Sequence, residues 1–164
     1  MAERPATKTE ILALGFIAAG IGLYFMLVGL GLLPIPGGPK NLHAPLWVVF
    51  AAGLAFALAG IAVLMHGFGY TNNDGEPPAG APRWVPVFQY LMGLAIFASF
   101  GAIASWIAFV PGPREFTGSG FGAEAPVSAI VGRVGFGIGA IIIWLATIAV
   151  AVSGARKLRR GSPT

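Results

Sequence analysis

The sequence predicts an all-α integral membrane protein, a bundle of four helices that each cross the bilayer. Four long stretches contain no Asp, Glu, Lys, Arg or His, and they cover residues 11–39, 44–65, 84–113 and 134–155. Each stretch can supply about 20 apolar residues, which at about 1.5 Å rise per residue crosses a hydrocarbon core roughly 30 Å thick. Hydrophobic residues form 56% of the chain and charged residues only 10%. In soluble domains charged residues are about a quarter of the total, so this composition favours a membrane protein.

The spans occupy most of the 164 residues, so we expect one transmembrane domain over 1–164 and no separate catalytic domain. Cysteine is absent. Its absence removes disulfide exchange, thiolate nucleophiles, thiolate zinc sites and iron–sulfur clusters from the candidate chemistries. The net charge of +4 does not indicate nucleic-acid binding, because the basic residues gather at the predicted membrane edges.

The element boundaries follow proline and glycine. Pro34 ends the first span and Pro45 opens the second, since proline suits only the first turn of a helix. Pro111 follows the third span, Pro126 opens the fourth, and Gly154 is a favoured stop. The predicted spans are therefore 9–33, 45–67, 84–110 and 127–154, with connections 34–44 and 111–126 outside and 68–83 inside.

The start of the first span resembles a signal peptide only superficially. Arg4 and Lys8 precede an apolar run, but that run continues to Leu33, beyond the roughly 7 to 15 residues of a signal-peptide core. Thr9 is the expected cap, and Glu10 in the first turn complements the helix dipole. We therefore expect an uncleaved helix.

Basic residues set the orientation. Three basic residues lie on the side of the connections 34–44 and 111–126, namely Lys40, Arg114 and Arg133. Seven lie on the side of the two termini, namely Arg4, Lys8, Arg83, Arg156, Lys157, Arg159 and Arg160. The positive-inside rule then predicts cytoplasmic termini, in a multi-pass protein of a bacterial inner membrane. The four residues that follow the last span, Arg156, Lys157, Arg159 and Arg160, are expected to contact anionic lipid.

The two halves of the chain share a pattern that suggests internal duplication. Residues 36–40 and 111–114 are similar Pro/Gly turns that end on a basic residue. Each is followed by an Ala-Pro pair and then by a small-residue helix, at 56–61 and 136–141. Two spans per half would make this a parallel repeat, with two hairpins related by an axis along the membrane normal.

Glycine marks the packing faces. Gly15, Gly22 and Gly29 recur every seven residues in the first span, and Gly53, Gly60 and Gly67 do so in the second. Small residues allow the close backbone approach by which helices associate in lipid. We expect contacts within the chain to use most of these positions.

The fourth span carries more glycine than four helices need. Gly132, Gly135, Gly137 and Gly139 point to more than one face, and Trp144 lies at mid-membrane with an indole N–H that needs an acceptor. These residues form a predicted helix-packing or partner interface. No cofactor is required, although a pigment or a structural lipid against this helix stays open.

The connection 111–126 is expected to be irregular, and it carries Arg114, Glu115, Phe116 and Phe121 among glycines. Docking on a partner and resting on the membrane surface are equally compatible with the two aromatic residues. Arg133 either snorkels to the outer interface, where Glu115 or Glu124 could pair with it, or is a buried cation that meets a partner subunit.

The sequence contains no group of residues in a pattern that is typical of haem binding, proton coupling or catalysis. His43 and His66 lie about 34 Å apart at helical rise and cannot jointly hold a haem. The spans contain no mid-membrane acid for proton coupling and no base beside a serine or threonine, so we expect neither catalytic nor metal-ligating residues.

The sequence therefore predicts a non-catalytic subunit that packs against a larger membrane complex, with lipid and either other membrane subunits or itself as partners. The alternative is a small homo-oligomeric transporter or channel whose path runs between chains. A lipid-modifying enzyme is a third and weaker hypothesis, because its site would have to come from the loops near His43, His66, Arg114 or Glu115.

Overall fold

The computed structural model describes residues 7–35, 37–38, 44–72, 75–111, 116–120, 123–127 and 129–160. It contains four long helices, α1 (Lys8–Gly29), α2 (Leu46–Gly67), α3 (Trp84–Phe109) and α4 (Ala129–Arg160), and a hairpin of β1 (Phe116–Gly120) and β2 (Ala123–Val127). All four helices are long and apolar enough to cross a membrane. The predicted four long apolar helices are thus present.

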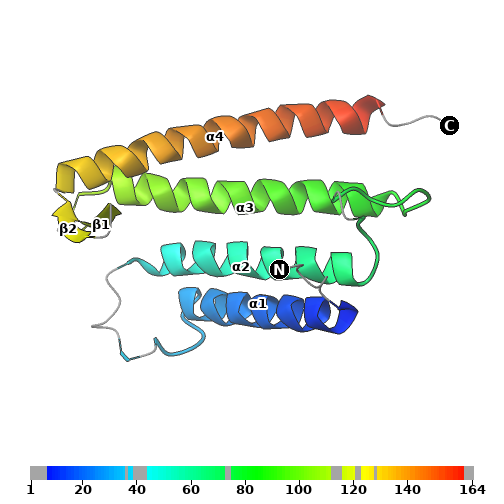
Figure 1. Ribbon diagram of the computed structural model, residues 1–164, viewed down its shortest axis with the longest axis horizontal. Coiled ribbons are helices and arrows are strands. Elements are labelled where there is room, and N and C mark those ends of the chain that lie inside the picture. Colours follow the sequence, from blue (N-terminus) through cyan, green and yellow to red (C-terminus); the bar gives the residue numbers. More distant parts are fainter. Residues whose placement is uncertain are drawn as a thin grey trace.

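The four helices lie side by side in chain order, with α1 and α4 on the outside (Figure 1). Packing is closest between α1 and α2, and closer between α3 and α4 than between α2 and α3. α1 begins, and α4 ends, at one end of the molecule, which we call the terminal end. The opposite end, which carries β1 and β2, is called the hairpin end.

Thr7 starts α1, two residues before the expected cap at Thr9. The Thr7 hydroxyl accepts a hydrogen bond from the backbone N–H of Glu10 at 3.3 Å. The Glu10 carboxylate accepts one in return from the backbone N–H of Thr7 at 2.6 Å. This capping box satisfies two N–H groups that the first helical turn leaves without partners, and it fixes the helix start.

Glycine, and not Pro34, ends α1. Gly31 has a φ of +72°, which lets its N–H bond to the carbonyl of Val28 while the next N–H bonds to the carbonyl of Leu27, both at 2.9 Å. This pair of bonds is a Schellman motif, which saturates the last helical carbonyls. Gly69, with a φ of +81°, ends α2 in the same way. The first span therefore stops at Gly29, short of the predicted residue 33.

The connection between α3 and α4 differs from the irregular loop that the sequence predicted. Its residues 116–120 and 123–127 pair as antiparallel strands, with Phe116 opposite Val127. Pro126 lies in β2, opposite Thr117, and does not open the fourth helix, which begins at Ala129. A proline is tolerated in such a strand because a two-stranded ribbon has an outer edge that needs no N–H donor.

The last helix also runs beyond its predicted end at Gly154, to Arg160. Gly154 lies against the ring of Tyr90 on α3, and a side chain at this position would overlap the ring. The Tyr90 hydroxyl donates a hydrogen bond to the carbonyl of Ala151 at 2.8 Å. Gly154 therefore serves helix packing and does not act as a stop.

The glycine stripes of α1 and α2 face each other. A Cβ on Gly53 would lie 2.7 Å from the carbonyl oxygen of Gly22, and one on Gly60 would lie 2.8 Å from that of Gly15. In folded proteins a Cβ atom essentially never lies within 3.0 Å of an atom outside its own stretch of chain. The seven-residue glycine repeats therefore bring the two backbones into contact, which is the association that small residues permit in lipid.

Aromatic side chains gather at both ends of the helices. Trp47 and Trp106 meet edge to face at the hairpin end, with ring centroids 6.4 Å apart. Tyr70, Trp84 and Phe88 form a chain of ring contacts at the terminal end. Rings of this kind suit the two interfaces of a bilayer.

Candidate helix-docking groove

The candidate site is built on the glycines of α4. Steps of three and four residues place Gly132, Gly135 and Gly139 on one face of the helix, because an α-helix has 3.6 residues per turn. Gly137 lies on a different face. The four glycines therefore split into two groups with different surroundings.

Gly137 is used inside the chain. It is buried, and a Cβ there would make ordinary contacts with the Ala108 Cβ at 3.7 Å and the Phe109 Cζ at 3.9 Å, both on α3. At Gly135 and Gly139, by contrast, a Cβ would meet no atom of the described residues within 4 Å. These two glycines form an open GxxxG surface.

That surface is one wall of an apolar groove between α3 and α4, on the half of the helices nearer the hairpin end. The groove has a volume of about 510 Å³. Glycine and apolar side chains line it, namely Phe100, Ile103, Ala104 and Ile107 of α3 and Val131, Gly132, Gly135, Phe136, Gly139 and Ile143 of α4. We call this the α3–α4 groove.

The α3 wall was missed in the sequence analysis. Phe100, Ile103, Ala104 and Ile107 follow the spacing of a single helix face, so the signal was present in the sequence. In a span that is apolar all round, however, such spacing does not separate a groove-facing stripe from a lipid-facing one. The rotation of α3 and α4 relative to each other decides whether this stripe faces the groove or the lipid.

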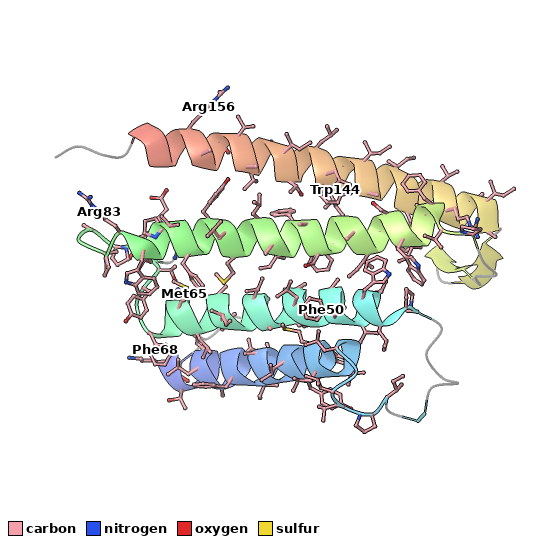
Figure 2. The ribbon with its side chains drawn as sticks, turned by 180° about the vertical axis from the view of Figure 1, so that it is seen from behind. Phe50, Met65, Phe68, Arg83, Trp144 and Arg156 are labelled. Atoms are coloured by element: carbon pink, nitrogen blue, oxygen red, sulfur yellow. The ribbon has the colours of Figure 1, made fainter. Side chains whose placement is uncertain are left out.

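Trp144 holds α4 to α3. Its indole N–H donates a hydrogen bond to the Ser105 hydroxyl at 3.1 Å, and that hydroxyl donates to the carbonyl of Gly101 at 2.7 Å. Gly101 leaves space for the ring, because a Cβ there would lie 3.0 Å from Cε2 of Trp144. The labelled side chain lies between the two helices in Figure 2. The acceptor that the indole needs is thus a neighbouring helix of the same chain.

Other hydroxyls within the helices are also occupied. Ser99, Thr147 and Ser153 each donate to the carbonyl four residues earlier in the same helix, at 2.7 to 2.8 Å. Such bonds satisfy a hydroxyl in an apolar medium without a second residue. These groups hold no activated nucleophile, because their protons are directed to carbonyl oxygens and not to a base.

The predicted contacts of the outer connection are only partly described. Arg114, Glu115 and Phe121 lie outside the described residues, and Phe116 is placed only as a backbone position of β1. Arg133 is half-buried near the start of α4, at the hairpin end. The structure does not bring these residues together with the glycine surface as one described site.

The predicted lipid-contacting residues lie at the terminal end. Arg156 is exposed and points away from the helices in Figure 2. Lys157, Arg159 and Arg160 belong to the last turns of α4, and their side chains lie outside the described part of the structure. His43 lies outside it as well, whereas His66 is half-buried near the end of α2.

The groove can therefore accept an apolar surface, and its lining offers no acid, base or nucleophile for a reaction. Among the residues that the structure describes, no three His, Asp or Glu side chains gather as metal ligands would. Comparison of the chain with protein-family models, with curated proteins and with solved structures found no match.

Proposed function

We propose that this chain is a non-catalytic subunit of a larger membrane complex and that a transmembrane helix of its partner docks in the α3–α4 groove. The observation that carries the proposal is the open GxxxG surface of Gly135 and Gly139, where an added Cβ would meet no described atom within 4 Å outside the adjoining backbone of α4. The glycines of α1 and α2 show what such a surface does when it is covered, because there the two backbones touch.

An apolar helix fits this groove better than a polar ligand does. Helices associate in lipid by close packing of small residues, since lipid tails give no hydrophobic driving force between them. The rest of α4 is also apolar and exposed, including Ile138, Ile142 and Leu145. A docked helix would cover these side chains together with the glycines, and it would come from another subunit or from a second copy of the chain.

The proposal includes an orientation, with both termini in the cytoplasm of a bacterial cell and the helices in its inner membrane. The excess of basic residues on the terminal side supports it. Because the chain lacks cysteine, single cysteines can report the side directly. On intact cells, an impermeant maleimide should label Ile35→Cys and should label Ala79→Cys only after permeabilisation. The reverse pattern would contradict the orientation.

The proposal also keeps the internal duplication. Packing within the pairs α1–α2 and α3–α4 is closer than packing between α2 and α3, which is the arrangement of two joined hairpins. The homo-oligomeric transporter has weaker support, because the span hydroxyls that could line a path already donate to carbonyls of their own helices. No cofactor enters the proposal.

Glycine substitutions test the docking groove. Gly135→Ile and Gly139→Ile place a side chain in the groove, since a Cβ at either position meets no described atom within 4 Å, and Gly20→Ile is the matched control, because Gly20 is equally open but lies on α1. We expect the wild-type protein and the Gly20 variant to copurify with the same partner, or the same second copy, from native membranes in mild detergent. The two α4 variants should lose it while they keep their helix content and melting temperature.

Photocrosslinking tests where the partner contacts the chain. A photoreactive residue at Ile107, in the groove, should crosslink to the partner, and one at Ile17, on the exposed side of α1, should not. A wild-type protein that is monodisperse and partner-free would contradict the proposal. So would a partner that is retained by both α4 variants.

A further inference from the structure

A second hollow lies at the terminal end, away from the α3–α4 groove. It has a volume of about 650 Å³ and is lined by residues of α1, α2, α3 and the connection after α2. This size falls within the range of about 300–1,000 Å³ that is usual for small-molecule sites. Met65, which lies between α2 and α3 in Figure 2, forms part of its wall. We call this hollow the terminal pocket.

Two polar atoms, on residues that line the terminal pocket, have no hydrogen-bond partner among the residues that the structure describes. They are Oγ1 of Thr71 and Nε2 of Gln89, and each is buried although its residue is only half-buried. An unsatisfied polar atom that is buried costs folding free energy, so native proteins rarely leave one without a partner. Both residues line the pocket, so a ligand there offers each atom a partner once the side chain turns toward it.

The structure holds these two atoms in position. The Schellman motif at the end of α2 fixes the chain just before Thr71, through the bond from the Tyr70 N–H to the Met65 carbonyl at 2.8 Å. Gln89 lies five residues after Trp84, the first residue of α3, which is about 7 Å along the helix axis. In a bilayer whose interface lies at Trp84 and Tyr70, the two residues lie at the depth of lipid headgroups and ester groups.

The lining divides into a polar part and an aliphatic part. The polar side chains, Thr71, Gln89, His66 and Asn72, can all donate hydrogen bonds, and the described lining contains no carboxylate. This set favours a ligand group rich in acceptor oxygens. The remaining large side chains are aliphatic or methionine, such as Leu14, Met92 and Ile96, without an aromatic ring to stack on a planar ligand. A flexible hydrocarbon chain fits that surface.

We propose that the terminal pocket binds one phospholipid molecule. Its phosphate or ester oxygens accept hydrogen bonds from Gln89 and Thr71, and one acyl chain lies along α3 beside Met92 and Ile96. Gly93 leaves the space for that chain, because a Cβ there would meet no described atom within 4 Å. The site is separate from the α3–α4 groove, so it stands or falls independently of the proposed function.

Thermal unfolding of the purified full chain in maltoside micelles tests the site. The probes are dioleoyl phosphatidylglycerol, dioleoylglycerol, which lacks the phosphate, and inorganic phosphate, which lacks the chains. A ligand that binds only the folded state raises the melting temperature. We expect phosphatidylglycerol to raise it for the wild-type protein, dioleoylglycerol to raise it less, and inorganic phosphate to leave it unchanged.

Variants locate the effect. Gln89→Leu and Thr71→Val remove the polar atoms at nearly constant size, and each should raise the phosphatidylglycerol concentration for half the shift about tenfold, as expected for loss of a hydrogen bond to a charged group. Without added lipid, Gln89→Leu should melt no lower than wild type, since it removes an unpartnered amide. Gly93→Leu should abolish the shift, whereas the equally open control Gly20→Leu should keep it.

Two results would overturn the assignment. If Gln89→Leu and Thr71→Val respond to phosphatidylglycerol as the wild-type protein does, the two polar atoms do not bind the lipid. If dioleoylglycerol is as effective as phosphatidylglycerol, or inorganic phosphate alone gives the full shift, the pocket does not recognise a phospholipid as a whole.

Discussion

Adding one methyl group at Gly53 should separate α1 from α2. A Cβ at this position would lie 2.5 Å from the backbone nitrogen of Met26, 2.7 Å from the carbonyl oxygen of Gly22 and 2.9 Å from the carbonyl carbon of Phe25. Ordinary contact begins at 3.4 Å, so the helices would have to move apart by about 1 Å. All three neighbours are backbone atoms, which cannot rotate away as a side chain can.

The expected cost of Gly53→Ala is therefore at the upper end of the range for overpacking, about 3 kcal/mol, or roughly a hundredfold in the ratio of folded to unfolded protein. Gly15→Ala should cost less, about 1 kcal/mol, because the nearest atoms there, at 2.8 Å, belong to the flexible side chain of Leu64. Gly20→Ala is the control, since a Cβ there meets nothing within 4 Å and alanine favours the helix.

Unfolding of the three variants by sodium dodecyl sulfate in mixed micelles, followed by circular dichroism, measures the difference. We expect the midpoint of Gly20→Ala to equal or exceed that of the wild type, with Gly15→Ala lower and Gly53→Ala lowest. The argument from backbone contact is refuted if Gly53→Ala unfolds at the wild-type midpoint or above it. An equal loss for Gly15→Ala and Gly53→Ala would show that the nature of the neighbouring atom does not decide the cost.

Two further substitutions test single hydrogen bonds. Trp144→Phe should destabilise the protein by about 1 kcal/mol in the same titration, because the bond to Ser105 is lost while the ring can still pack on Gly101. A variant as stable as wild type would mean that this bond contributes nothing net. Thr7→Ala should cost about 1 kcal/mol locally, because it removes the cap of α1. Hydrogen exchange should then quicken in the first turn of α1, and unchanged exchange there would speak against the capping box.

Some features were predictable because they depend on local sequence and on the solvent alone. An uncharged stretch of 20 or more residues satisfies its backbone only as a helix in lipid, so the four long apolar helices followed directly from the sequence. The seven-residue glycine repeats of α1 and α2 likewise indicated a close contact before the structure placed Gly22 against Gly53. Each inference needs only helical periodicity and the missing hydrophobic force between helices in lipid.

Helix ends were less predictable, because competing local signals exist in the chain. Pro34 was expected to stop α1, but Gly31 reaches a left-handed conformation first and closes the Schellman motif. Pro126 was expected to open α4, but it lies in β2, which pairs with β1. Pairing depends on a second segment of chain, and a glycine-rich stretch gives little strand signal of its own.

The sequence by itself determined the four helices that are apolar enough to cross a membrane, and the surplus of glycine in the fourth one. The tertiary structure decided which glycines of α4 pack against another helix of the chain. Gly137 faces α3, whereas Gly135 and Gly139 stay open. It also brought Thr71 and Gln89, 18 residues apart in the sequence, to one pocket. The physical reason is that a helix with apolar residues on every side has no sequence pattern that indicates which side will pack against a neighbour. Only the rotation of each helix against its neighbours assigns a residue to packing, to lipid or to a partner.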